Sequence, residues 1–363
     1  MKKILAIAAI GALTLQGAQA QTTQRLTANK ASEYALIYSL PKTALDITVE
    51  AELTELEPGE FYNYANRHLG IADAIRRPDR KATVRSVVIS THGEPDADER
   101  WQVQFKSGTA PFITLDERGV PVGVNTDDIA AESAVALPVA REAAPTPLET
   151  EAARQAVTQD MTRSSSVSKR AELAAQRIFE LREMRSDLLS GQSDNTPPDG
   201  KAMQLVLDNI AAQEAALTAM FAGTEKTSTV VRTISFVPDS ADVDRMVLAR
   251  ISPVDGIVTP DDLGGAPLTL SMRVSSAASL PLTDKGEPKR FPKGGFAYNI
   301  PGEAIVEISY DGETVATATV QLAQLGVTFG IDPGVFTDKK APSMLKLDPA
   351  TGAIRLLAPV ERP

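Results

Sequence analysis

The sequence predicts an α+β protein in which two antiparallel, sandwich-like β-rich domains have an αα-hairpin between them. Apolar and polar residues alternate over most of 33–125 and again after residue 224, which is the period of half-buried strands. Between these parts, apolar residues recur every three or four positions, the period of an amphipathic helix. The expected division is a signal peptide at 1–20, an N-terminal β-rich domain at 21–127, a linker at 128–167, a helical hairpin at 168–223 and a C-terminal β-sandwich-like domain at 224–363.

The first twenty residues are typical of a cleaved secretory signal peptide. Two lysines precede an apolar run at 4–15, and Ala-Gln-Ala at 18–20 is a small-residue cleavage site. The run is too short to cross about 30 Å of hydrocarbon as a helix. We therefore expect the mature chain to begin at Gln21, to work outside the cytoplasm and to have no transmembrane segment after cleavage.

The composition narrows the class of function. The chain has 47 acidic and 37 basic residues, so its acidic surface should repel nucleic acid, and no nucleic-acid partner is predicted. It contains no cysteine, which excludes disulfides, thiol nucleophiles, thiolate metal sites and a cysteine-linked lipid anchor. The sequence has no phosphate loop, nucleophile elbow or zinc-protease motif. No cofactor is predicted.

In the N-terminal part, the clearest strand is 47–56, where apolar side chains alternate with Thr and Glu. The short helix that follows should end at Gly70, because glycine accepts the left-handed backbone of a helix end. The elements expected here are, in order, a strand at 47–56, a helix at 60–69, strands at 83–90 and 101–105, and a hairpin over 112–124.

Residues 128–167 are rich in Ala, Pro, Thr and Glu, which favours a linker or a loosely packed excursion. Two helices of about 22 residues should follow, joined by a short loop at 194–200, so they should pack antiparallel. Gly191 and Gly223 mark their ends. Burying about ten apolar side chains does not offset the ordering of more than about forty residues. The hairpin must therefore lean on a β-domain or on another protein.

After residue 224 the strand pattern returns. Strands are expected at 229–237, 246–251, 267–274, 302–310 and 314–321, with a closing hairpin over 345–357. Asp311-Gly312 favours a two-residue hairpin turn, since both residues tolerate a positive φ. The hairpins at 112–124 and 345–357 resemble each other, because each places an Asp before a Gly and an apolar strand after it. They are either parts of a duplicated β-domain or two ordinary hairpins.

Several short phrases occur in a fixed order along the chain. They are YSLPKT at 38–43, YA at 64–65, LG at 69–70, PDG at 198–200, MFAG at 220–223, IPG at 300–302 and DPATG at 348–352. By these phrases the chain resembles a family of exported proteins from Bacteroides-like Gram-negative bacteria, known as a domain of unknown function. The resemblance spans nearly the whole mature chain and is weakest through the linker. It implies a periplasmic or outer-membrane-associated location, and it brings no catalytic residues. An extracellular location stays open.

The two histidines are the first candidates for chemistry. His68 falls in the last turn of the short helix, where a cation complements the helix dipole, and catalysis is the alternative. His92 opens an acidic segment in which Glu94, Asp96 and Asp98 are candidate calcium ligands. The segment lacks the glycine and glutamate of an EF-hand loop, so a solvated turn between strands is the simpler explanation.

Two other patterns allow a binding role. The basic stretch 76–85 would suit an anionic polysaccharide or an acidic partner, although a solvated loop is the simpler explanation. Trp101 and Phe105 alternate on one strand, which would suit a sugar platform, although a buried sheet face is the simpler explanation. We therefore expect an exported, non-catalytic scaffold or binding protein, with an envelope protein or a glycan as partner. The alternative is a glycan-processing hydrolase with two carboxylates about 5–10 Å apart. Ligand and oligomeric state stay open.

Overall fold

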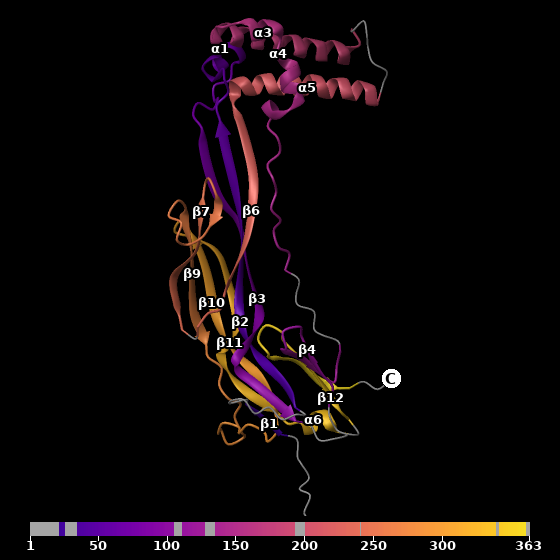
Figure 1. Ribbon diagram of the computed structural model, residues 1–363, viewed down its shortest axis with the longest axis vertical. Coiled ribbons are helices and arrows are strands. Elements are labelled where there is room, and N and C mark those ends of the chain that lie inside the picture. Colours follow the sequence, from indigo (N-terminus) through magenta and orange to yellow (C-terminus); the bar gives the residue numbers. More distant parts are fainter. Residues whose placement is uncertain are drawn as a thin grey trace, which may run out of the picture.

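The computed structural model describes residues 22–25, 35–104, 111–127, 135–192, 200–239, 241–338 and 341–360. The predicted signal peptide, residues 1–20, lies outside these ranges. The described residues confirm the α+β class, with several antiparallel sheets and a smaller group of helices. Figure 1 shows a long molecule, with most of its helices gathered at one end and strands extending to the other, where the short helix α6 (Gly334–Thr337) also lies.

Three long strands run along the molecule. β2 (Leu36–Glu57) pairs antiparallel with β3 (Asp79–Gln104) on one side and with β6 (Thr224–Phe236) on the other, and β1 (Thr22–Arg25) extends the sheet to the order β1-β3-β2-β6. At about 3.3 Å per residue, the 22 residues of β2 reach about 70 Å. The strands predicted at 47–56 and 83–90 lie within β2 and β3.

A second sheet covers one face of this long sheet. It has the order β11-β10-β9-β7-β8 and is built from β7 (Val243–Ser252), β8 (Gly256–Val258), β9 (Ala266–Ser276), β10 (Phe296–Tyr310) and β11 (Glu313–Ile331). The apolar face of β2 and the inward faces of β9 and β10 share one core. The turn between β10 and β11 forms as predicted, since Asp311 and Gly312 have φ values of 51° and 84°.

The two hairpins that resemble each other in sequence lie side by side in a third sheet. Its order is β13-β12-β5-β4, from β4 (Ile113–Leu115), β5 (Pro121–Val124), β12 (Ser343–Leu347) and β13 (Ile354–Pro359). The short helix α6 (Gly334–Thr337) packs beside it, and Phe336, Leu345 and Leu347 are buried in the same core.

The predicted N-terminal and C-terminal β-rich ranges share their sheets. β6 follows the helices in sequence but pairs with β2, and β12 pairs with β5. The boundaries at 127 and 224 therefore do not separate independent hydrogen-bonded sheets. Strand pairing of this kind depends on contacts between distant parts of the chain, which local sequence patterns do not report.

All the described helices except α6 form one group, which we call the helical head. It contains the 3₁₀ helices η1 (Tyr62–Tyr64) and η2 (Pro147–Glu149) and the α-helices α1 (Ala65–Leu69), α2 (Glu151–Ala156), α3 (Gln159–Arg163), α4 (Val167–Ser190) and α5 (Lys201–Ala222). Ser166 caps α4 by accepting a hydrogen bond from the Lys169 N–H. Gly70 and Gly191 end α1 and α4 in the left-handed conformation, as the sequence predicts.

The range predicted as a linker contains helices. η2, α2 and α3 all lie within 128–167, and Ala156 and Met161 are buried in the core of the helical head. Alanine is the best helix former, so an alanine-rich stretch becomes helical once tertiary contacts cover one face. Phe61 and Ala65 belong to the same core, so the predicted helical hairpin does lean on the rest of its own chain. Residues 128–134 lie outside the described ranges.

A buried polar joint fixes the third sheet to β2. Thr43 is fully buried, and its hydroxyl donates to the Ala350 carbonyl at 2.9 Å while it accepts from the Ala323 N–H at 3.0 Å. The Gln324 side chain completes the joint, because it accepts from the Thr43 N–H and donates to the Thr43 carbonyl. Each buried polar group here has a partner, so the joint is stable rather than strained.

Candidate functional site

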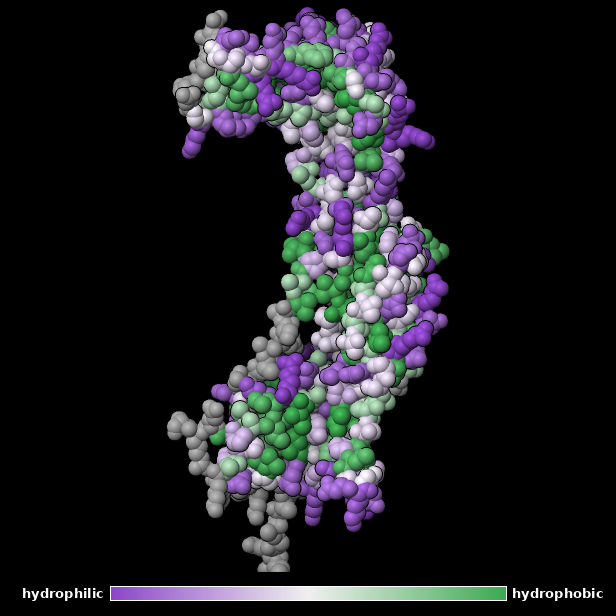
Figure 2. Space-filling model, turned by 180° about the vertical axis from the view of Figure 1, so that it is seen from behind, coloured by the Kyte–Doolittle hydropathy of each residue, from purple (hydrophilic) through white to green (hydrophobic). Residues whose placement is uncertain are grey.

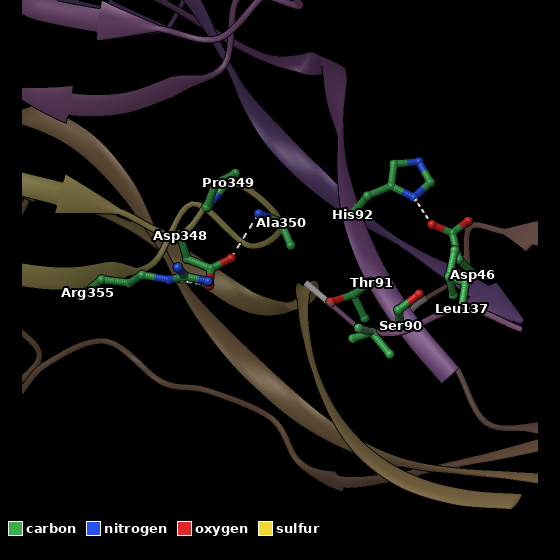
Figure 3. Close-up of a pocket in the computed structure, with 10 residues that line it drawn as sticks. Asp46, Ser90, Thr91, His92, Leu137, Asp348, Pro349, Ala350 and Arg355 are labelled. Atoms are coloured by element: carbon green, nitrogen blue, oxygen red, sulfur yellow. Dashed lines mark hydrogen bonds and ion pairs between the residues drawn. The ribbon is translucent and has the colours of Figure 1, made fainter. Parts of the chain in front are cut away.

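The candidate site is a cleft of about 580 Å³ where the long sheet meets the β12–β13 hairpin (Figure 3). β2 supplies Asp46, β3 supplies Ser90, Thr91 and His92, the hairpin supplies Asp348, Pro349, Ala350 and Arg355, and Val135 and Leu137 come from the segment before η2. The cleft thus combines parts of the chain that are far apart in sequence.

The alternation of β2 explains why Asp46 faces the cleft. Its neighbours Leu45 and Ile47 are buried in the core between the two large sheets, so Asp46 points to the other face. Asp46 lies opposite Ser90 on β3 and Ser235 on β6. The Ser235 hydroxyl donates to one oxygen of the Asp46 carboxylate at 2.5 Å.

His92 lies between two carboxylates. Its Nδ1 is 2.6 Å from Asp46 Oδ2, and its Nε2 is 3.6 Å from Glu94 Oε1. The side chain of His92 is one-quarter exposed. Both ring nitrogens therefore face acceptors, which suits a positioned donor better than a base that activates a hydroxyl. No hydrogen bond joins Ser90 to His92 within the described part of the chain.

Asp348 organises the other wall of the cleft. One carboxylate oxygen accepts the N–H groups of Ala350 and Thr351 at 2.8 and 2.9 Å. The other oxygen pairs with the Arg355 guanidinium at 2.8 Å from Nε and 2.6 Å from Nη2. Asp348 thus stabilises the β12–β13 turn by accepting backbone N–H groups, as Asp residues commonly do in tight turns.

The two aspartates test the hydrolase alternative. Asp46 and Asp348 line the same cleft, as a carboxylate pair would require. Each is already engaged by the partners described above, however, and a general acid must present a protonated oxygen to the leaving group. The arrangement therefore suits recognition of a ligand better than proton transfer to one.

The acidic segment after His92 is not a turn, and this prediction was wrong. Residues 92–99 lie within the continuous strand β3, where Pro95 faces Pro41 of β2 at an irregular position in the ladder. Proline is tolerated there because the ladder needs no N–H at such a position. Gly93 and Pro95, which favour a turn locally, therefore lie inside a continuous strand.

The three candidate calcium ligands do not gather around one point. Asp96 pairs with Lys42 at 3.1 Å and accepts the Asp98 N–H at 2.9 Å, whereas Glu94 faces His92. Among the residues that the structure describes, no group of three or more His, Asp or Glu side chains is placed to hold a metal ion.

The other sequence candidates have structural surroundings. His68 lies near the rings of Tyr64 and Phe221, at centroid distances of 6.2 and 6.4 Å, at the end of α1. Trp101 stacks on Phe291 at 5.4 Å, so it is covered rather than offered to a sugar. Phe105 lies outside the described residues. In the basic stretch, Arg80 pairs with Glu55 and Arg85 with Glu52 across the sheet.

Sequence reasoning missed Asp46, Asp348 and Arg355 as parts of a cleft. Asp46 gave a weak indication of a site, because this acidic residue is flanked directly by the apolar residues Leu45 and Ile47. Asp348 was noted only as a turn residue. Nothing local indicates that the two positions meet.

A second, shallower groove of about 440 Å³ lies on the helical head. Arg182, Arg185, Ser186 and Leu189 of α4 line it together with Glu214 of α5. Arg182 pairs with Glu214 at 2.7 Å and lies over the Phe179 ring. No helix in the described ranges is both long enough and apolar enough to span a membrane.

Comparison with known families shows which family the chain belongs to. The model of the domain of unknown function DUF4831 matches residues 34–355. The chain therefore belongs to the DUF4831 family. No curated protein and no solved structure matches it.

Proposed function

We propose that this DUF4831 protein is an exported, non-catalytic scaffold or binding protein of the cell envelope. The observation that carries the proposal is the distance between its two candidate contact regions. The helical head lies at one end of the long sheet, and the third sheet lies at the other end (Figure 1). A protein that connects partners benefits from such separation, whereas an enzyme needs groups that converge on a reacting atom.

The surface of the helical head supports a protein partner. Phe179, Leu189 and Leu205 are 51, 66 and 71% exposed, respectively, on α4 and α5. Scattered apolar residues are normal on a surface, but these lie on an element that also offers a groove with two arginines. Arginine and aromatic side chains such as Phe179 are enriched at protein interfaces, and exposed apolar patches mark such sites. The head is therefore the proposed contact with an envelope protein.

The experiment is site-specific photocrosslinking from the helical head in intact cells. A photoreactive residue at position 186, which lines the groove, should give a discrete crosslinked product with an envelope protein. Leu189→Ser combined with Leu205→Ser should abolish that product, because it removes the exposed apolar contacts. Leu263→Ser is the matched control, since Leu263 is 81% exposed and lies between β8 and β9. Equal crosslinking by the otherwise unchanged protein, the Leu189→Ser/Leu205→Ser variant and the Leu263→Ser control would contradict the proposal.

A carboxylate-dependent glycan hydrolase is the second candidate, because two aspartates line one cleft of suitable size. The test is release of reducing ends from envelope polysaccharide by the purified mature protein. Activity that Asp46→Asn and Asp348→Asn each abolish, while the folded state survives, would favour the hydrolase. We expect no release by the wild-type protein.

A further inference from the structure

The two hairpins of the third sheet are the same structure used twice. Both contain an Asp that accepts backbone N–H groups, and both have a glycine with positive φ three or four residues later. The first hairpin pairs Ile113 with Val124, Thr114 with Gly123 and, after a one-residue shift, Leu115 with Pro121. The second pairs Leu345 with Leu357, Lys346 with Leu356 and, after a one-residue shift, Leu347 with Ile354. The two hairpins therefore have the same pairing register and the same one-residue shift at the same place.

The hairpins are also arranged in tandem. The sheet order β13-β12-β5-β4 places the second strand of the first hairpin beside the first strand of the second. At this junction Val124 pairs with Leu345, and Gly123 pairs with Lys346. β13 is therefore the structural equivalent of β5, and β4 is the equivalent of β12. β13 pairs with β12 and β4 pairs with β5, as the repeat requires. Within the described residues, neither β13 nor β4 has a strand on its other side.

The outer edge of β13 has the surface of an interface. Ile354, Leu356 and Leu357 are 36, 40 and 45% exposed, and Figure 2 shows apolar surface gathered near this end of the molecule. Exposed apolar edge strands pair readily with further strands unless charges or coverage prevent it. The one charged residue of β13 is Arg355, whose guanidinium already pairs with Asp348 of its own turn.

The opposite edge offers the matching strand. β4 carries no charged residue, and Phe112 just before it is 59% exposed. The edge strand β4, which is equivalent to β12, thus lies at one end of the sheet. The edge strand β13, which is equivalent to β5, lies at the other end.

We propose that a second copy of this chain docks its β4 onto β13, which continues the third sheet from molecule to molecule. The internal junction sets the register: Leu357 pairs with Ile113 of the next copy, and Leu356 pairs with Thr114. Phe112 of the next copy then lies opposite Ala358. The contact joins two different surfaces, so it adds copies in a ring or an open row rather than closing a two-fold dimer. This assembly goes beyond the proposed binding role and does not depend on it.

The absence of cysteine makes disulfide trapping a clean test. Leu357→Cys and Ile113→Cys are made as separate mature full-length proteins and are mixed under mild oxidation. The mixture should give a covalent dimer, whereas neither variant should do so alone. Within one molecule the two positions are three strand spacings apart, about 14 Å, which is too far for a disulfide. Leu357→Cys mixed with Leu263→Cys is the control and should stay monomeric.

Two other outcomes would overturn the proposal. A covalent dimer from Leu357→Cys alone would mean that β13 pairs with itself across a two-fold axis. Failure of the mixture to crosslink beyond the control would mean that the edges do not meet.

Sedimentation velocity provides an independent measurement without cysteines. The wild-type mass should rise with concentration beyond a dimer, and Leu357→Lys should lose these larger species. Leu263→Lys, a change at another exposed leucine, should retain them. Circular dichroism checks that both variants are folded. A wild-type protein that stays monomeric up to its solubility limit would refute the assembly. The same result would leave the crosslinking test of the helical head unaffected, so the two proposals fail separately.

Discussion

A single glycine allows the close contact between β3 and the β12–β13 turn. Gly93 of β3 lies under the β12–β13 turn, and a Cβ added there would be 2.1 Å from the Pro349 carbonyl oxygen. Because the obstacle is backbone, it cannot rotate away. Glycine is needed at this position for close approach rather than for an unusual φ.

We therefore predict that Gly93→Ala destabilises the protein by about 1–3 kcal/mol, since the added methyl forces the turn away from β3. Urea unfolding of the mature protein measures the change. Gly334→Ala is the control: its methyl would meet only the Asp332 side chain, so its effect should stay within about 0.5 kcal/mol. Equal effects of the two substitutions would contradict the steric explanation.

Tyr38 provides a pH-dependent prediction. Its hydroxyl is buried and accepts the Ala297 N–H at 3.0 Å, and burial raises its pKa above the ordinary value of 10.0. The unfolded chain therefore ionises this phenol first. Its contribution to stability is full below about pH 10 and falls above that by up to about 1.4 kcal/mol per pH unit.

Tyr38→Phe should lower the free energy of unfolding at neutral pH by about 1–3 kcal/mol, because the buried Ala297 N–H loses its partner. It should also flatten the alkaline fall in stability relative to the wild type. Urea unfolding between about pH 8 and about pH 11 checks both effects. Parallel curves for the two proteins would show that Tyr38 does not ionise on unfolding.

At the scale of elements, the helical head and the long sheet are separate packing units. Ile178 and Leu217 are fully buried in the core of the head, whereas β9 and β10 belong to a different core. The ion pair between Arg182 and Glu214 joins α4 to α5 at the surface, where such pairs contribute about 0–1 kcal/mol. The head is therefore held mainly by its apolar contacts.

Ile178→Ala should cost about 2–5 kcal/mol of local stability, because it leaves a cavity between α4 and its neighbours. Hydrogen exchange should then accelerate in α4 and α5 while β9 and β10 stay protected. Leu205→Ala, at a position 71% exposed, is the control and should change little. Loss of protection throughout the chain would mean that head and sheets unfold as one unit.

At the scale of the whole molecule, the predicted signal peptide can be tested directly. The chain has no cysteine and therefore no disulfides to stabilise it, so the long sheet depends on the cores described above. Intact mass of protein purified from the cell envelope should correspond to a chain that begins at Gln21. Ala20→Asp should block processing, since the cleavage site requires a small residue, and the uncleaved precursor should remain. Detection of the full 38.6 kDa chain in the envelope of wild-type cells would contradict export by cleavage.

Local patterns predicted the elements well wherever the pattern was long. The three-four spacing before Gly191 and Gly223 predicted α4 and α5, and Asp311-Gly312 predicted the turn between β10 and β11. They failed where tertiary contacts override a local signal, as in the unbroken β3 and in the helices within 128–167. The candidate cleft was not predictable, because Asp46 and Asp348 are far apart in sequence and line one cleft only after the fold has brought β2 and the β12–β13 turn together, as the joint at Thr43 does.

The sequence by itself determined the periods of its strands and helices, their glycine ends, the matching hairpins and the predicted export signal. These depend on the backbone preferences and the polarity of neighbouring residues. The tertiary structure alone decided that β6 returns to pair with β2, that both hairpins join one sheet and that His92 lies between Asp46 and Glu94. Contacts between distant segments depend on which surfaces fit together after folding, and no local pattern encodes that fit.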